Sequence, residues 1–170
     1  QSLAWPYSAW WNRDTKAMID TDYGMEINAT RSCTNACVAC NHASTKFTAS
    51  YYMEPEVLKR DLEGMKGELH VKLFMVQGGE PLLHPKVTEL LKLIYESGMA
   101  HQYGVLTNGK LLPRMKDDFW ECLGERKMEL RMSCYPDLSP DIVPFAEDKA
   151  TKYGFSIRPQ KIDYFQTVFL

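Results

Sequence analysis

Segments typical of strands and of helices alternate along most of this 170-residue chain. Short apolar runs end in glycine or polar turns, and most are followed by a run with apolar residues at helical spacing. The expected strands span 25–29, 70–76, 101–106, 128–134 and 155–158, and the expected helices span 54–66, 85–97, 112–123 and 139–153. This alternation predicts βαβ units, right-handed crossovers and a parallel sheet.

About five such units fit in the chain, whereas a complete eight-fold barrel needs at least about 200 residues. We therefore expect an α/β fold, a partial TIM-like (β/α)5–6 barrel with parallel strands. Its chemistry should lie at the carboxyl ends of the strands. Residues 1–22, which include Trp5, Trp10 and Trp11, are expected to form an N-terminal aromatic arm. The barrel at residues 23–170 is either a minimal form or a fragment of a longer one.

The composition is that of an ordinary globular protein, with 45% hydrophobic and 25% charged residues. The formal net charge is −2, and no basic stripe is present that would favour nucleic acid. No apolar run approaches the roughly 20 residues that span a bilayer, and the first residues lack a signal-peptide pattern. We expect a cytoplasmic protein that binds neither nucleic acid nor membranes.

The unusual residues of the chain lie at the ends of the expected strands. In chain order they are Cys33, Cys37 and Cys40, then Gly78-Gly79-Glu80-Pro81, then Thr107-Asn108-Gly109, then Ser133 and Cys134, and finally Arg158. Because parallel strands end at the same edge of a sheet, loops from separate parts of the sequence should converge on one rim.

Three of the five cysteines fall within eight residues, and Cys122 and Cys134 stand apart. An odd number in a chain without secretion signals argues against a disulfide framework. Thiolates suit iron–sulfur clusters and zinc, and three in one loop leave one coordination position open. A zinc ion would recruit His42 as its fourth ligand and form a Cys3His site.

The segment Cys33-Thr-Asn-Ala-Cys37-Val-Ala-Cys40 resembles the CxxxCxxC loop of the radical S-adenosylmethionine (SAM) superfamily. The Gly78–Pro81 segment resembles the GGEP motif of that family, and the turn at 107–109 is common there. The resemblance covers about residues 23–158 and implies a [4Fe–4S] cluster held by the three cysteines. Reductive cleavage of SAM at this cluster would give a 5′-deoxyadenosyl radical that abstracts hydrogen from a substrate. Ala39 departs from the family, which usually has an aromatic residue there.

The resemblance also implies roles for residues at the other strand ends. The backbone of Gly78 and Gly79 would receive the methionine amino group. Glu80 would join that contact through its carboxylate, and Pro81 would complete the motif. Asn108 would contact SAM or substrate, and Ser133 would reach the ribose. Arg158 would pair with the SAM carboxylate, for which a guanidinium is well suited.

The two separate cysteines have different expected roles. Cys134 is either a small buried hydrophobe or a catalytic thiol that faces the barrel mouth and donates hydrogen. Cys122 is expected to pack in the core, because it lies within a helix pattern.

The sequence therefore predicts a radical SAM enzyme. Its substrate would be a small molecule, such as a sugar or nucleotide sugar, or a peptide. An electron donor such as flavodoxin or ferredoxin would reduce the cluster. The alternative is a non-catalytic zinc-binding module built from Cys33, Cys37, Cys40 and His42.

Overall fold

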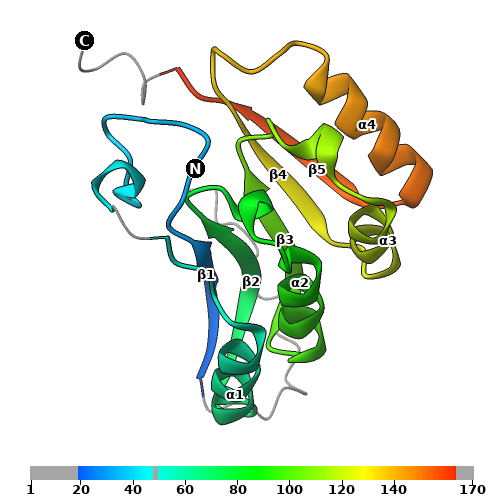
Figure 1. The fold of residues 1–170 in the computed structure, drawn as a ribbon. Coiled ribbons are helices and arrows are strands. Elements are labelled where there is room, and N and C mark those ends of the chain that lie inside the picture. Colours follow the sequence, from blue (N-terminus) through cyan, green and yellow to red (C-terminus); the bar gives the residue numbers. More distant parts are fainter. Residues whose placement is uncertain (1–18, 48–49, 164–170) are drawn as a thin grey trace, which may run out of the picture.

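Five parallel strands form one sheet in the order β1-β2-β3-β4-β5 (Figure 1). The structure is a computed structural model that describes residues 19–47 and 50–163. The strands are β1 (Ile19–Thr30), β2 (Leu69–Gly78), β3 (Ala100–Thr107), β4 (Glu129–Cys134) and β5 (Ser156–Lys161). This arrangement confirms the predicted α/β fold with parallel strands, in the form of a partial barrel.

One helix follows each of the first four strands. The helices are α1 (Pro55–Met65), α2 (Val87–Glu96), α3 (Asp117–Glu125) and α4 (Ile142–Tyr153). Because consecutive strands are neighbours and each crossover has the same hand, the helices form a layer on one face of the sheet (Figure 1). The other face is left free of helices and curves around the interior of the partial barrel.

The third helix begins later than the sequence predicts. A 3-10 helix at Leu112–Arg114 precedes it, and the backbone is then extended at Met115 and Lys116. Pro113 lies in the first turn of the 3-10 helix, where proline is tolerated. Asp117 and Asp118 follow in the first turn of α3, where acidic side chains favour the helix start.

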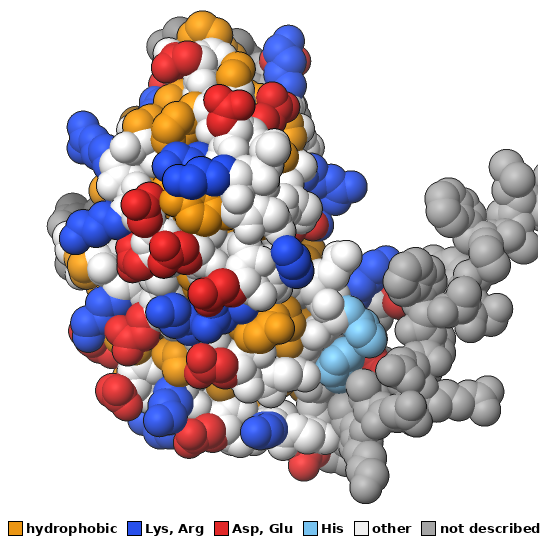
Figure 2. Space-filling view, turned by 90° about the vertical axis from the view of Figure 1, so that its right-hand side faces the viewer, with side chains coloured by type: hydrophobic (Ala, Val, Ile, Leu, Met, Phe, Trp, Pro, Cys, Tyr) orange, Lys and Arg blue, Asp and Glu red, His pale blue; other side chains and the backbone are white. Residues whose placement is uncertain are grey.

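The core lies between the sheet and the helix layer. Trp120 of α3 is buried, and its ring stacks on that of Phe155 with the centroids 6.0 Å apart. Cys122, on the same helix, is buried in this cluster as expected. The apolar face predicted for α2 is also buried, and consists of Val87, Leu90, Leu91 and Ile94. On the helix face shown in Figure 2, acidic and basic side chains are interspersed.

Strand β1 begins six residues before its predicted start and forms an edge of the sheet. Residues 19–22 of the expected aromatic arm therefore belong to the sheet. The rest of that arm, with its three tryptophans, lies outside the described residues. Within the described part of the chain, no helix is long and apolar enough to cross a membrane.

Two helical glycines offer a matched test of the packing between α3 and α4. A Cβ added at Gly124 would lie 2.1 Å from the carbonyl oxygen of Tyr153, whereas one at Gly64 of α1 would meet nothing within 4 Å. Gly124→Ala should lower the free energy of unfolding by about 1–3 kcal/mol through this clash. Gly64→Ala should raise it by about 0.5–1 kcal/mol, because alanine favours the helix. Urea unfolding followed by circular dichroism measures both, and equal effects would contradict this packing.

Candidate active site

The three clustered cysteines line one cavity at the carboxyl ends of the strands. Its volume is about 250 Å³. The wall also includes Gly78 and Gly79 after β2, Asn108 after β3 and Ser133 of β4. The structure thus brings together residues that are up to 100 positions apart, counting from Cys33 to Ser133. All five cysteines have free thiols.

The glycine pair fits tightly against the loop that carries the cysteines. Gly78 has a φ of 142°, and a Cβ added there would lie 2.4 Å from the carbonyl oxygen of Thr30. A Cβ on Gly79 would lie 2.3 Å from that of Ser32. The N–H groups of Gly79 and Glu80 donate to these same two oxygens, each at 2.8 Å. Glycine is thus required here to let two backbone segments meet, a constraint that sequence reasoning had assigned to SAM alone.

The Glu80 side chain is fully buried and joins the second loop to the third. One carboxylate oxygen accepts from the N–H of Leu82 at 3.0 Å and from the hydroxyl of Thr107 at 2.7 Å. The other accepts from the N–H of Asn108 at 2.9 Å. Burial raises the pKa of Glu80, and the three donors oppose that shift. Its carboxylate is fully occupied in joining loops and does not line the cavity.

Asn108 in turn joins the third loop to the cysteine loop. Its side-chain NH₂ donates to the hydroxyl of Thr34 at 2.8 Å and lies 3.9 Å from the Sγ of Cys33. Its side-chain oxygen accepts from the N–H of Lys110 at 3.2 Å. The loops after β1, β2 and β3 are therefore linked in sequence, through Gly79, Glu80 and Asn108.

The thiols are held in a partly dry environment. Burial raises the pKa of Cys33, and a hydrogen bond from the N–H of Asn35 at 3.4 Å opposes the shift. Burial and the neighbouring Cys40 raise the pKa of Cys37, and a hydrogen bond from Tyr135 opposes that shift. The raised pKa values of Cys33 and Cys37 favour their protonated thiols until a cationic metal centre displaces the protons.

Several polar residues of the cavity wall were not singled out from the sequence, among them Tyr135, Gln77 and Asn35. Tyr135 directly follows β4, and Gln77 directly precedes the glycine pair and donates to Glu26. Asn35 lies between the first two cysteines, and neither polar atom of its buried amide has a hydrogen-bond partner among the described residues. The sequence could have indicated these residues, because each lies close in the chain to a residue already predicted at a strand end. Three soft thiols and an unpaired amide on one wall fit an iron–sulfur cluster with a polar ligand beside it.

The remaining predicted residues lie in different places. Ser133 lines the cavity, and Pro81 is buried at the start of a 3-10 helix. Cys134 is half-buried against the core and does not line the cavity. Arg158 lies in the middle of β5, where its guanidinium is 3.9 Å from Glu129, and it lines a separate hollow on the free face of the sheet. The structure does not bring Arg158 to the cysteines.

His42 also lines the cavity, two residues after the last cysteine of the loop. Among the described residues, no three of the ligand atoms of Cys33, Cys37, Cys40 and His42 lie within 4.8 Å of one another.

Comparison with known protein families gives a match to the radical SAM superfamily. The profile of the radical SAM superfamily matches residues 27–125, which include the cysteine loop, the glycine pair and Asn108. No curated protein matches the chain.

Several solved structures share the fold. That of anSMEcpe with bound AdoMet has a TM-score of 0.58 and 20% identity, and covers 83% of this chain and 44% of its own. A structure of anSMEcpe with AdoMet and the Cp18Cys peptide has a TM-score of 0.55 and 21% identity. The match covers 83% of the present chain and 42% of the anSMEcpe chain. BtrN in complex with AdoMet and 2-DOIA has a TM-score of 0.58 and 14% identity. The match covers 86% of the present chain and 58% of the BtrN chain. The present chain thus spans less than two thirds of each of these proteins.

The role of Glu80 can be tested by a substitution that preserves its shape. In Glu80→Gln only one oxygen accepts, and the new NH₂ group faces an N–H or hydroxyl donor. The free energy of unfolding should fall by about 1–3 kcal/mol, the cost of leaving a buried polar group unsatisfied. Chemical denaturation provides the measurement. Glu63→Gln, on the exposed side of α1, is the matched control and should change it by less than about 0.5 kcal/mol. Similar losses in both variants would show that Glu80 does not join the loops.

Proposed function

This chain belongs to the radical SAM superfamily, and on that premise we propose that it cleaves SAM reductively and removes a hydrogen atom from a polar substrate. The observation that carries the proposal is the cavity where Cys33, Cys37 and Cys40 meet the glycine pair. When bound, the [4Fe–4S] cluster and SAM of this family supply a 5′-deoxyadenosyl radical as the hydrogen-abstracting species.

The residues of the rim hold and orient these groups. The three thiols provide the ligands and leave one position of a four-iron cluster open for SAM. The side-chain amide of Asn35 has no hydrogen-bond partner among the described residues, so it can bond a polar group of the ligand. Tyr135 donates a hydrogen bond to Cys37 and can stabilise its thiolate. Ser133 remains our proposed partner of the SAM ribose.

The glycine pair and Glu80 have separate parts in the proposal. The cavity-lining backbone of Gly78 and Gly79 is our proposed contact for the methionine amino group. Glu80 supports that contact indirectly, by holding the second loop against the third. Two further roles stay predictions, those of Arg158 with the SAM carboxylate and of Cys134 as a hydrogen donor.

The substrate we propose is a polar small molecule or a peptide. The cavity that holds the three cysteines is also lined by charged, amide and hydroxyl side chains, and these include Glu26, Asn35, Asn41, Gln77 and Tyr135. Such a lining favours a ligand with several polar groups over an apolar one. Two of the similar structures named above hold a further ligand beside AdoMet, which is 2-DOIA in one and a peptide in the other. An external electron donor of the flavodoxin or ferredoxin kind would complete the reaction.

A zinc-binding module is the second candidate function, because His42 lies in the same cavity as the three cysteines. It would bind one ion, release no product from SAM and remain colourless. The two functions therefore differ in metal content and in SAM cleavage, and one preparation can separate them.

Replacing Cys37 tests the proposal. After anaerobic reconstitution, the unaltered chain should hold about four irons and release 5′-deoxyadenosine from SAM under a strong reductant. In Cys37→Ala both the iron content and the product should fall to background, because a thiolate ligand is lost.

Cys122→Ala is the control, since that thiol is buried in the core away from the cavity. It should retain iron and SAM cleavage while losing about 1 kcal/mol of stability. Full SAM cleavage by Cys37→Ala would overturn the assignment. Uptake of one zinc ion and no iron by the unaltered chain would favour the zinc module instead.

A further inference from the structure

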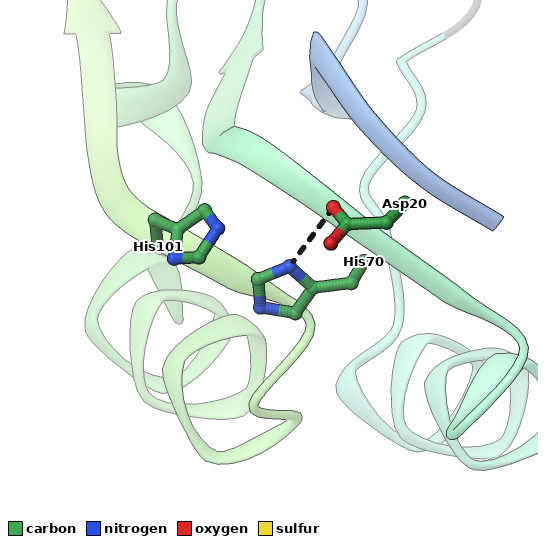
Figure 3. A group of neighbouring side chains, drawn as sticks. All are labelled: Asp20, His70 and His101. Atoms are coloured by element: carbon green, nitrogen blue, oxygen red, sulfur yellow. Dashed lines mark ion pairs between the residues drawn. The ribbon is translucent and has the colours of Figure 1, made fainter. Parts of the chain in front are cut away.

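A second group of ligand-type side chains lies at the opposite end of the sheet from the cysteines. Asp20, His70 and His101 are each the second residue of their strand, in β1, β2 and β3 respectively. Asp20 and His70 are direct partners in the strand register. Because parallel strands also begin at a common edge, the three side chains meet at the amino end of the sheet (Figure 3).

The three side chains are close enough to share one ion. Their ligand atoms all lie within 4.8 Å of one another. The Nδ1 of His70 is 3.6 Å from Oδ1 of Asp20, and the rings of His70 and His101 are 4.4 Å apart at 79°. In the part of the chain that the structure describes, this is the one group of three or more His, Cys, Asp or Glu side chains with such spacing.

His70 provides an independent sign that something is bound here. Its side chain is 10% exposed, and its Nδ1 is buried with no hydrogen-bond partner among the described residues. A buried polar atom without a partner costs about 1–3 kcal/mol. The distance of 3.6 Å to Asp20 is too long for a hydrogen bond. A cation at this position would satisfy the ring nitrogen of His70.

We propose that Asp20, His70 and His101 form a binding site for a divalent transition-metal ion of the zinc type. Two imidazoles and one carboxylate are a donor set that zinc accepts, with water as the fourth ligand. Zinc at about 2.0–2.2 Å from each ligand would place the ligand atoms about 3.4 Å apart, so side-chain shifts of about 1 Å close the site. The exposed position of His101 leaves an open side for the water.

The position of the site indicates a structural role. Eight residues along β2 separate His70 from Gly78, roughly 26 Å of strand, so the ion would lie far from the radical chemistry. It would instead join the edge strand β1 to β2 and β3 near the first residues of these strands. A ligand bound only by the folded chain stabilises that fold by mass action.

The simplest competing explanation is an Asp20–His70 ion pair without metal. That explanation involves two of the three residues and gives no role to His101, whose ring is exposed at the surface. The two explanations differ in whether removing His101 changes metal binding. His101→Ala is also a mild substitution for the fold, because the side chain lies outside the core.

Calorimetric titration of the full chain with zinc ions alone tests the site. The unaltered protein, with its cysteines reconstituted, should bind one zinc more than His101→Ala, or bind it at least about tenfold more tightly. Asp20→Asn should weaken the same binding event, because it removes the negative charge. The comparison is valid whatever the cysteines hold, since they are identical in all these proteins. Circular dichroism without added metal should show the same fold in each.

His42→Ala is the matched control, because His42 lies beside the cysteine loop rather than at the amino end. It should retain the zinc that His101→Ala loses. Zinc should also raise the midpoint of thermal unfolding of the unaltered chain and leave that of His101→Ala unchanged. Equal zinc binding by the unaltered chain and His101→Ala would overturn the proposal, as would a loss confined to His42→Ala.

Discussion

The buried carboxylate of Glu80 is the interaction on which the candidate site depends. It accepts three hydrogen bonds from its own loop and from the loop after β3, in a place that water does not reach. The side chain of Asn108 donates a hydrogen bond to Thr34 in the cysteine loop. The N–H of Gly79 donates to the carbonyl oxygen of Thr30, at the start of the same loop. Three loops that end three different strands thus act as one rim. A metal cluster with only three protein ligands needs such a rim, because the ligand spacing must hold while one position stays open.

The sequence predicted the order of strands and helices and the convergence of the strand-end residues, because both follow from periodicity and from the geometry of parallel sheets. It did not predict what Glu80 contacts. A carboxylate after a glycine pair can face a ligand or turn inward, and the choice depends on donors contributed by Thr107 and Asn108, 27 and 28 residues away. The sequence also placed Arg158 at the end of its strand, but it lies in the middle of β5, opposite Arg131 in the register and with its guanidinium 3.9 Å from Glu129.

The sequence also placed the start of β1 too late, at residue 25 instead of Ile19, for a physical reason. Residues 19–24 carry two aspartates and a glycine, which are poor strand formers. They extend the strand through pairing with β2, interrupted by an irregularity between Thr21 and Gly24. This extension is what brings Asp20 beside His70. The two ends of the sheet therefore carry different groups. The carboxyl end carries the three thiols of the proposed cluster site, and the amino end carries the ligands of the proposed stabilising ion.

The central claim is that SAM binds the iron that Cys33, Cys37 and Cys40 leave free. Electron paramagnetic resonance of the reduced, reconstituted chain tests it most directly, with spectra recorded before and after SAM is added. The account predicts the signal of a reduced [4Fe–4S] cluster whose shape changes when SAM is present, because a new ligand joins one iron. A signal that stays unchanged at saturating SAM, or no cluster signal from a chain that has bound zinc, would contradict it.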